Sequence, residues 1–594
     1  MKNSSTSSAA TSAPAVSLSN ELFLGTFRWD LIAAFPGQDE ADRRTGDEAV
    51  AEFTRFLYER VDPTGTDHAR ELSKAVVEEL RDRGCLRLMV AREDGGRGLS
   101  PYNTFRLIEA AASWSLPVAN VMGIGNGFGA GAYLKMPLDG PLRDVLRAHV
   151  AAGNVSGRAD TEPAGAGNSR QTTVATPVDG GRAYRLNGEK VFIGNAVIAD
   201  LLDVTATVHT DEGPQSASFF VDTASPGLHV AGQQDFMGLG GAPIGRVILD
   251  DVEVPASRML TGGDLGRLAR EVKEFIYLAR TMSVVPPSLA VSRLCLEWSR
   301  AFTNRRTIDG RPLGSFPEIQ RMVALSVAET YAVESLVRWT LLSGGTDPLH
   351  EHAVLKNVAS ETCWRVLERT MGLLGGEGYE TAASKARRGV QPLPLERFHR
   401  DARGLRISGG VDYLVDLLAG QIRLTDCYYE RTYRQAPPGD EAEAGRRIAE
   451  TLGGPCAGHV AHVTAQAAEL ARACRELTER HPDRADGFRE QHTVLTLHGI
   501  ANELLTMGAV LARSAAEDPT GTSGTRELAD IHCAAARRRL TGLWEQLDEG
   551  CAEQYAGVAA RWLGGHAHEE LLGDALTAVP PAGNHPHHQQ GVHS

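Results

Sequence analysis

The sequence lacks the features that mark several classes of protein. Aromatic residues make up only 6% of its 594 residues, and 61 Lys and Arg stand against 75 Asp and Glu, a formal charge of −14. Nucleic-acid-binding domains normally present a basic face, so this balance predicts no nucleic-acid partner. No run of about 18 uninterrupted apolar residues occurs, so we expect no membrane span.

Cysteine motifs and targeting signals are also missing. The eight cysteines never stand in C-x-x-C spacing, which excludes a zinc ribbon and a thioredoxin-type motif. At this density they favour buried, reduced thiols in a soluble, cytoplasmic protein. The first residues have neither the apolar core of a secretory signal nor the arginines of a transit peptide. Their Ser, Thr and Ala content predicts a disordered tail over residues 1–20.

The patterns that are present predict three successive domains. Hydrophobic residues at 42% and charged residues at 23% are ordinary for a globular protein. Apolar residues at three- and four-residue spacing predict an N-terminal helical domain over 21–150. Short β-branched runs separated by turn residues predict a central β-domain over 151–260. Helical periodicity then returns and predicts a helical bundle domain over 261–432.

The rest of the sequence predicts an appended helical unit. The segment YRQAPPGDEAEAG is rich in Pro, Gly and acidic residues, which favours a linker over 433–445. Amphipathic segments follow and predict a C-terminal helical extension over 446–578. The irregularly spaced histidines of 579–594 are interpreted as a disordered tail rather than a metal site, and no metal site is predicted elsewhere. The predicted fold class is therefore α+β, with an added C-terminal helical domain.

Six short motifs occur in a fixed order along the chain. They are TEPAGAG (161–167), YRLNGEKVFIGNAVIAD (184–200), DDVEVP (250–255), TNRRTIDGRPLGSFPEIQ (303–320), LGGEGY (374–379) and LERFHRDAR (395–403). Each motif is weak alone, but their order and separations resemble the acyl-CoA dehydrogenase family. The early segment ELFLGTFRWDLIAAFP and the C-terminal extension make the very-long-chain type the closest subgroup. The fold of that family, with a helical N-terminal domain, a central β-domain and a C-terminal four-helix domain, agrees with the order derived from periodicity.

The resemblance implies a homodimeric flavoenzyme that binds FAD and desaturates the α,β-carbons of an acyl thioester. The acyl group is carried by CoA or by a carrier protein, and an electron acceptor flavoprotein is the partner if the enzyme is redox-active. Such chemistry needs a base for the α-proton, a hydride acceptor beside the β-carbon, and donors that stabilise charge on the carbonyl oxygen.

The catalytic positions depart from the family pattern. Gly409 stands where the family has its catalytic Glu, so only a backbone N–H is left there to polarise the carbonyl. Some members of the family carry the catalytic base at another position. In this sequence that position falls near Leu278 and Ala279, and neither residue is acidic. Arg280 matches an Arg that the family keeps near the catalytic carboxylate, although helix packing would also explain it.

Three carboxylates of the sequence could replace the missing base. Asp160 stands at a flavin-facing place before the TEP motif, but it can alternatively pair with Arg158. Asp412 follows the lost Glu position and can alternatively cap the helix that begins with YLVDLLAG. Glu274 lies on the helix that carries the matching Arg, and we interpret it as an outward-facing charge. Asp160 and Asp412 remain the candidates.

The resemblance also implies which residues hold FAD. In this sequence they are Arg158, Asp160, Thr161, Gly165, Gly167, Phe192, Gly194, Arg306, Gly375, Gly376, Gly378 and Val411. Gly-rich turns can offer backbone N–H groups to phosphate or flavin oxygens, and Arg306 suits the FAD pyrophosphate of a neighbouring subunit. Gly194 and Val411 replace threonines of the family. Taken alone, each of these residues is typical of an ordinary turn or helix end. Their assignment to FAD binding therefore depends on the order of the motifs.

Three functions remain open on the sequence alone. The first is a flavoenzyme that desaturates an acyl thioester without the usual Glu. The second keeps the thioester pocket but performs redox-neutral α-proton chemistry, namely elimination, isomerisation or internal displacement. The third is a catalytically silent, flavin-free scaffold subunit, which the lost positions and the large extension favour.

Overall fold

The computed structural model describes residues 16–138, 140–168, 170–211, 213–261, 269–343, 349–548, 552–565 and 567–575. The chain divides into two compact units, 1–540 and 541–594, and each is described by itself. The second unit contains the helix α23 (Ala552–Leu563) and a short 3₁₀ turn (Glu569–Leu572). The tail predicted over 579–594, Cys551 and most of the tail predicted over 1–20 lie outside the described residues.

The N-terminal helical domain is built from seven helices over residues 40–151. They are α3 (Glu40–Arg60), α4 (Pro63–Ala69), α5 (Lys74–Asp82), α6 (Pro101–Trp114), α7 (Leu116–Gly127), α8 (Ala130–Tyr133) and α9 (Pro141–Ala151). Several of them begin as helix-capping chemistry requires, because Asp39, Asp62, Ser73 and Ser100 accept hydrogen bonds from N–H groups of the following turn.

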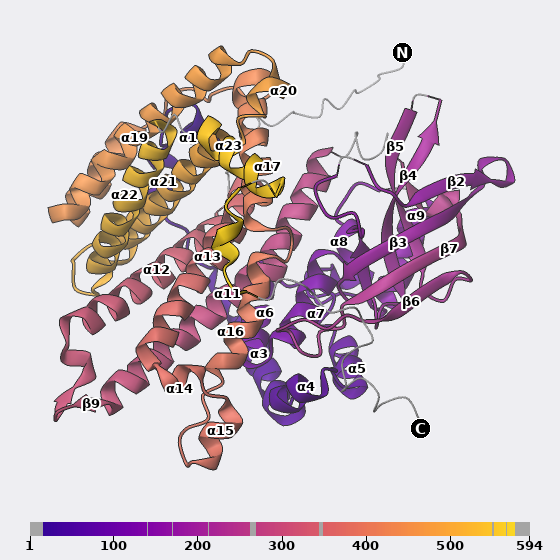
Figure 1. Ribbon diagram of the computed structural model, residues 1–594, viewed down its shortest axis with the longest axis horizontal. Helices are drawn as coiled ribbons and strands as arrows, with labels where there is room; N and C mark the ends of the chain where they lie inside the picture. Colours follow the sequence, from indigo (N-terminus) through magenta and orange to yellow (C-terminus); the bar gives the residue numbers. More distant parts are fainter. Residues whose placement is uncertain are drawn as a thin grey trace, which may run out of the picture. The chain divides into compact units, whose positions relative to one another are not determined.

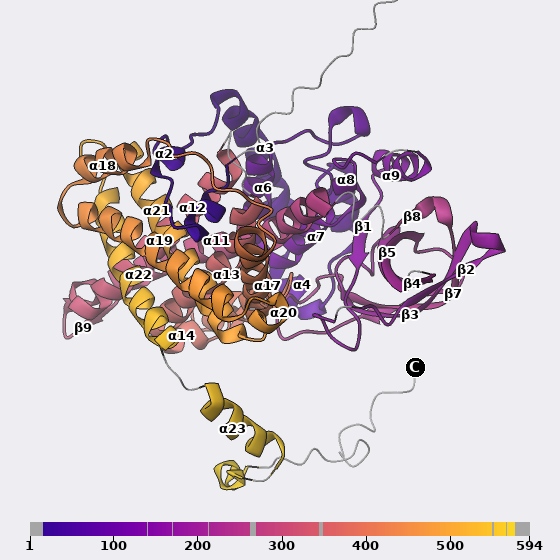
Figure 2. The same cartoon turned by 90° about the horizontal axis from the view of Figure 1, so that it is seen from above.

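The central β-domain is one eight-stranded sheet with the order β6-β7-β3-β2-β4-β5-β8, in which β1 also pairs with β4. The strands are β1 (Ser156–Ala159), β2 (Val174–Val178), β3 (Ala183–Ile193), β4 (Leu201–Thr210), β5 (Gly213–Asp222), β6 (Leu228–Gln233), β7 (Gly245–Pro255) and β8 (Met259–Leu260). The first eight residues of β4 are buried, because this strand lies between neighbours inside the sheet. Figure 2 shows the sheet curling around β4 and β5.

The helical bundle packs against the first domain through α11. Its helices are α11 (Ala269–Arg305), α12 (Pro317–Leu342), α13 (Leu349–Leu374), α14 (Gly376–Tyr379), α15 (Ala382–Arg387), α16 (Leu395–Arg403) and α17 (Asp412–Leu424), with a two-strand hairpin of β9 (Thr307–Ile308) and β10 (Arg311–Pro312) after α11. Figure 1 shows α11 and α13 in the middle of this unit, between the sheet and the extension. The predicted α+β fold with a bundle after the sheet is confirmed.

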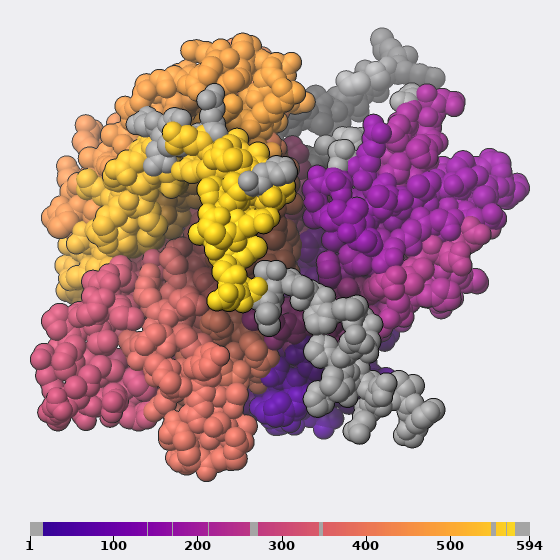
Figure 3. Space-filling view, in the orientation of Figure 1, coloured from indigo at the N-terminus to yellow at the C-terminus, as the bar shows by residue number. Residues whose placement is uncertain are grey.

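The C-terminal extension consists of α18 (Glu441–Leu452), α19 (Gly454–Arg480), α20 (Arg484–Gly487), α21 (Gln491–Glu517) and α22 (Thr525–Asp548). On the face drawn in Figure 3, the orange surface of the extension and the magenta surface of the β-domain lie on opposite sides. By length and composition α21 could cross a membrane, with a mean hydropathy of 1.4 over its most apolar window. However, 78% of that window is buried in the protein, as in the core helix of a helical domain.

A short N-terminal segment packs inside this extension. The segment contains α1 (Leu18–Phe23) and α2 (Trp29–Ile32), and all six residues of α1 are buried. Trp29 Nε1 donates a hydrogen bond of 2.9 Å to Thr464 Oγ1 of α19. The Phe27 ring fills the space that Gly508 leaves, since a Cβ there would lie 2.0 Å from Phe27 Cζ. Ordered structure therefore begins inside the segment predicted as a tail over 1–20.

The cysteines within the described ranges are free and buried, which confirms the prediction of buried thiols. They are Cys85, Cys295, Cys363, Cys427, Cys456, Cys474 and Cys533. Burial raises the pKa of Cys85 and of Cys427 to about 12, so both thiols are protonated at neutral pH. We infer that these side chains serve as small apolar core residues.

Candidate active site

Arg280 of α11 packs against the turn before α17 that carries Gly409. Gly409 has φ +70°, and a Cβ built on it would lie 3.3 Å from Arg280 Cγ. Among the described residues, neither the Gly409 N–H nor the Arg280 guanidinium makes a hydrogen bond or an ion pair. The guanidinium carbon lies 5.8 Å from the centre of the Tyr277 ring. Burial lowers the pKa of Arg280, so an anionic or carbonyl oxygen here would relieve the cost of burying it.

Helix α13 fixes the turn that carries Gly409. Lys356 is fully buried, and its Nζ donates to the Gly410 carbonyl at 2.9 Å. The amide of Asn357 donates to the Asp412 carbonyl at 2.9 Å. These two bonds hold both sides of the turn, so the Gly409 N–H keeps a defined position although no described residue accepts its hydrogen bond. Sequence reasoning missed both α13 residues, because more than fifty positions separate them from the turn.

Asp412 is held by two cations, which argues against it as a base. Its Oδ1 lies 3.2 Å from Lys356 Nζ, and its Oδ2 accepts a hydrogen bond of 2.6 Å from Arg406 Nε. The alternative that Asp412 caps the following helix is wrong, since α17 begins at Asp412 itself and Val411 is the cap residue. Both carboxylate oxygens are therefore engaged, and proton abstraction would break an ion pair.

Asp160, the other candidate base, has an open carboxylate at the end of β1. Its side chain is 55% exposed, and its Oδ1 accepts a hydrogen bond of 2.8 Å from Thr205 Oγ1. Arg158 Nη2 lies 3.7 Å from the same oxygen, so the alternative prediction that Asp160 pairs with Arg158 holds as a long contact. The other oxygen, Oδ2, makes no hydrogen bond to any described residue. Asp160 also interacts electrostatically with Arg280.

Arg158 belongs to a buried polar cluster. Its guanidinium pairs with Asp203 of β4, and Nη1 also donates to the Tyr133 hydroxyl at 2.8 Å. The Tyr133 hydroxyl in turn donates to Asp203. Burial alone would lower the pKa of Arg158, but Asp203 and Tyr133 raise it, so the charge is permanent. The structure thus places the guanidinium predicted to contact FAD against protein partners.

The TEP and LNGEK motifs are joined by a buried ion pair. Lys190 is fully buried, and its Nζ lies 2.9 Å from Glu162 Oε1. Glu162 also accepts hydrogen bonds from the Thr173 N–H at 2.8 Å and from the Thr172 hydroxyl at 2.7 Å. The pair fixes the start of the flavin-facing loop to β3, which explains why both motifs contain these residue types.

This pair predicts a pH dependence of stability. Burial alone would raise the pKa of Glu162, but hydrogen bonds from Thr172 and Lys190 lower it to about 2, against 4.5 when exposed. The resulting stability is present above pH 4.5 and is lost as the pH falls through 2, a change of about 3 kcal/mol. Urea unfolding at pH 5 and pH 3 tests this. In Glu162→Gln the loss between these pH values should be smaller than in the parent protein, and equal losses would contradict the assignment.

The Gly-rich part of the TEP loop faces α17. Gly165 and Gly167 have φ angles of +93° and +90°, and a Cβ on Gly165 would meet nothing within 4 Å. A Cβ on Gly167 would lie 3.7 Å from Leu414, one turn after Val411. The Thr161 hydroxyl has no partner among the described residues. The structure therefore brings this predicted flavin loop beside the turn that precedes α17.

Phe192 and Gly194 form a second part of the predicted flavin site. Phe192 is 57% exposed, which is unusual for an aromatic side chain on a strand and leaves a ring face open to a ligand. At Gly194 a Cβ would lie 2.9 Å from Ile124 Cδ1 of α7, so a side chain there would require the end of Ile124 to move. Ile124 thus takes up the space where the family places a threonine, a replacement that the sequence did not reveal.

The predicted ADP contacts form a separate group at the far end of the bundle. Arg305 pairs with Glu377 at 2.6 Å, which brings the end of α11 beside α14 and places Arg306 near Gly375, Gly376 and Gly378. The Arg306 side chain is exposed and has no partner among the described residues. Figure 1 shows β9 and α14 at one end of the bundle, away from β3. One chain therefore does not bring its two groups of FAD residues together.

The residues in both groups fit FAD chemically. The exposed Phe192 ring and the open space at Gly165 suit an isoalloxazine ring. Arg306, which is exposed and has no partner among the described residues, together with the open space at Gly375 and Gly376, suits a pyrophosphate, whereas Gly378 is buried and packs against the Met371 carbonyl.

Comparison with known proteins identifies the family. Models of the N-terminal, middle and C-terminal domains of acyl-CoA dehydrogenase match residues 45–136, 158–252 and 270–416, more than half of the chain. The chain belongs to the acyl-CoA dehydrogenase family. This confirms the resemblance that rested on the six ordered motifs.

Curated relatives of this acyl-CoA dehydrogenase family member differ in how much of it they match. The probable acyl-CoA dehydrogenase FadE10 of Mycobacterium tuberculosis is 27% identical over 89% of this chain and 86% of its own. The human mitochondrial very long-chain specific acyl-CoA dehydrogenase is 25% identical over 68% of this chain and 61% of its own, which supports the very-long-chain type. The 3-sulfinopropanoyl-CoA desulfinase of Advenella mimigardefordensis is 29% identical over 56% of this chain and 82% of its own.

A solved structure shares nearly the whole fold of this family member. It is an acyl-CoA dehydrogenase from Bacillus anthracis complexed with FAD, and it covers 94% of this chain and 96% of its own with a TM-score of 0.73. The sequences are 18% identical, so the likeness shows the fold alone. The family match supports the FAD binding that the sequence predicts.

Proposed function

We propose that this protein is an FAD-binding enzyme that removes the α-proton of an acyl thioester and desaturates its α,β-carbons, with Asp160 in place of the missing Glu. The observation that supports this proposal is that the Gly409 N–H and the Arg280 guanidinium make no hydrogen bond to the described residues, and that Arg280 interacts electrostatically with the exposed carboxylate of Asp160. Buried polar groups of a folded protein normally have hydrogen-bond partners, so groups without one are expected where a bound ligand provides the partner.

Each residue has a separate role in the proposed reaction. The Gly409 N–H and the Arg280 guanidinium donate to the thioester carbonyl oxygen and stabilise the negative charge that develops there. Asp160 Oδ2 takes the α-proton, while Thr205 and Arg158 hold Oδ1 and so orient the carboxylate. FAD, when bound, supplies the hydride acceptor.

The assembly and setting of the enzyme are part of the proposal. Because the two groups of FAD residues lie apart in one chain, we infer a homodimer in which Arg306 of one copy serves the flavin of the other. The acyl group is carried by CoA or a carrier protein, the protein is soluble and cytoplasmic, and an electron acceptor flavoprotein reoxidises the flavin.

A redox-neutral reaction is the second candidate. It uses the same donors and the same carboxylate, but no electrons leave the substrate. Two observations favour it: Ile124 fills the place where the family has a threonine at the flavin, and a relative is a desulfinase rather than a dehydrogenase.

One experiment separates these reactions. The purified protein is titrated with FAD while the flavin absorbance near 450 nm is recorded, and it is then incubated with butyryl-CoA or octanoyl-CoA in D₂O. Desaturation predicts bound flavin that bleaches with substrate, together with deuterium at the α-carbon. Redox-neutral chemistry predicts α-deuterium or product without bleaching. A protein that takes up neither FAD nor deuterium would overturn both readings and leave the scaffold function.

A further inference from the structure

Arg280 carries a positive charge that no described residue neutralises. Its side chain is partly buried, and burial lowers its pKa, but a guanidinium stays protonated in proteins. Among the described residues, no carboxylate lies within ion-pair distance of it. The Tyr277 ring, at 5.8 Å, lies near the limit of about 6 Å for cation–π attraction and carries no charge. An anion beside Arg280 would therefore lower the cost of burying it.

The aspartates of this site do not supply that anion. The Asp412 carboxylate is shared by two other cations, so both of its oxygens are engaged. Asp160 attracts Arg280 only from beyond ion-pair distance, and Arg158 Nη2 lies nearer to it, at 3.7 Å. A bound molecule is the remaining source of a negative charge within the described site.

The thioester carbonyl of the proposed reaction uses only part of the guanidinium. A carbonyl oxygen has two lone pairs, and the Gly409 N–H takes one of them. One N–H of Arg280 takes the other, which leaves four of its five N–H groups without an acceptor. A carboxylate can accept two parallel hydrogen bonds from one edge of a guanidinium, and it also brings the opposite charge. A second, anionic acceptor on the same substrate would therefore complete the contacts of Arg280.

Helix α7 closes one side of α11 to a long acyl chain. A Cβ on Gly127 would lie 2.8 Å from Ala279 Cα, so the backbones of the two helices are in contact. The same holds one turn earlier on α7, where a Cβ on Gly123 would lie 2.9 Å from Ser283 Cα. Ala279 and Ser283 flank Arg280 along α11. An acyl chain that starts at the guanidinium cannot pass between these helices without separating them.

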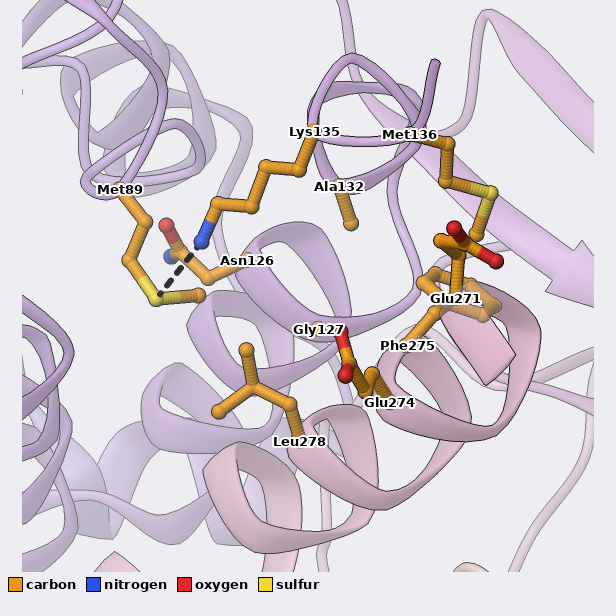
Figure 4. Close-up of a pocket in the computed structure, with 10 residues that line it drawn as sticks. All are labelled: Met89, Asn126, Gly127, Ala132, Lys135, Met136, Glu271, Glu274, Phe275 and Leu278. Carbon is orange, nitrogen blue, oxygen red and sulfur yellow. Dashed lines mark hydrogen bonds between the residues drawn. The ribbon is translucent and has the colours of Figure 1, made fainter. Parts of the chain in front are cut away.

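The pocket drawn in Figure 4 does not extend this site. Gly127 of α7 and Leu278 of α11 are among the residues that line it. Leu278 and Arg280 are two residues apart, so their side chains point about 200° apart around the helix. On the side of α13, the Thr281 hydroxyl lies 3.0 Å from His352 Nδ1 and joins the two helices. The space at Arg280 therefore suits a short acyl group.

We propose that the substrate is the thioester of a short dicarboxylic acid, with two or three carbons between the thioester carbonyl and a free carboxylate, and that Arg280 binds both groups. This inference rests on the proposed function and names its substrate class. The lower limit follows because desaturation needs both an α- and a β-carbon. The upper limit follows because one guanidinium must reach both groups, and the packing of α7 and α13 on α11 gives a longer chain no room.

Exchange of the α-hydrogen in D₂O tests this with two pairs of thioesters of equal chain length. Succinyl-CoA is compared with butyryl-CoA, and glutaryl-CoA with pentanoyl-CoA. We expect kcat/KM for exchange to be about tenfold or more higher for the carboxylate-bearing member of at least one pair, mainly through a lower KM. In Arg280→Met, exchange should slow for all four thioesters, because the carbonyl loses a donor, and the preference for the carboxylate should disappear.

Two further variants give the test its controls. Arg280→Lys keeps the charge and should keep part of the preference, and it serves if Arg280→Met fails to fold, which thermal unfolding shows. Arg300→Met removes an exposed arginine of the same helix and should leave the preference unchanged. Equal kcat/KM values within both pairs, or a preference that survives in folded Arg280→Met, would overturn the inference.

Titration calorimetry with the same four thioesters separates this inference from the proposed reaction. If no thioester exchanges but the carboxylate-bearing ones bind about tenfold more tightly through Arg280, the reaction is wrong and the substrate class stands. If the neutral thioesters exchange as fast and bind as tightly as their partners, the reaction stands and the substrate class is wrong.

Discussion

Replacing Asp160 by Asn should slow α-deuterium incorporation into an acyl thioester by about 10²- to 10⁴-fold, the usual contribution of a general base. Asn keeps the size of the side chain, and its amide oxygen can still accept the hydrogen bond from Thr205, so the fold should not change. The loss is expected in the rate constant, with little change in the concentration of thioester needed for half-saturation. Exchange in D₂O followed by mass spectrometry measures it.

Asp412→Asn is the informative comparison for this prediction. Asp412 pairs with Lys356 and Arg406, so its replacement leaves a buried lysine without its counter-ion and lowers stability. In the fraction that remains folded, exchange should continue. If Asp412→Asn stops exchange while Asp160→Asn retains it, the assignment of the base is wrong.

Replacing Trp29 by Ala should lower the free energy of unfolding by about 3–5 kcal/mol, the cost of removing a large buried aromatic side chain. Trp29 is 1% exposed and its ring lies 4.4 Å from that of Phe27, measured between centres. It also packs so closely on α18 that a Cβ on Gly445 would lie 2.9 Å from Trp29 Cδ1. Urea unfolding gives the loss.

Two variants of the same residue type show whether this loss is specific. Trp29→Phe keeps most of the ring but removes the hydrogen bond to Thr464, so its loss should be clearly smaller. Trp562→Ala removes a partly exposed tryptophan of the second unit and should cost less than about 1 kcal/mol. A Trp29→Ala protein within 1 kcal/mol of its parent would mean that the N-terminal segment does not hold the extension together.

The fold class was predictable because its signals are local. Helical spacing in α3, α6 and α11 and β-branched runs in β4 and β7 occur within single elements. The six motifs added the family, since each fixes a turn or an ion pair such as that of Glu162 with Lys190. These features need no knowledge of which segments meet in space.

The site was predictable only as a set of positions. The pairing of Arg158 with Asp203, the locking of Asp412 by Lys356, and the filling of space at Gly194 by Ile124 all join residues that lie far apart in sequence. No periodicity reports such contacts. The sequence therefore predicted both Asp160 and Asp412 as candidate bases. The contacts that each carboxylate makes in the structure distinguish the two.

The burial of the N-terminal segment also sets the order of events during synthesis. Trp29 leaves the ribosome early, but its partner Thr464 is 435 residues further along the chain. At about 5–20 residues per second, translation takes roughly 20–90 s to supply that partner. During this interval α1 and α2 have no apolar surface of the extension to pack against, so the newly made chain exposes a hydrophobic segment that a chaperone can bind. The first helices to be made are thus among the last to be packed.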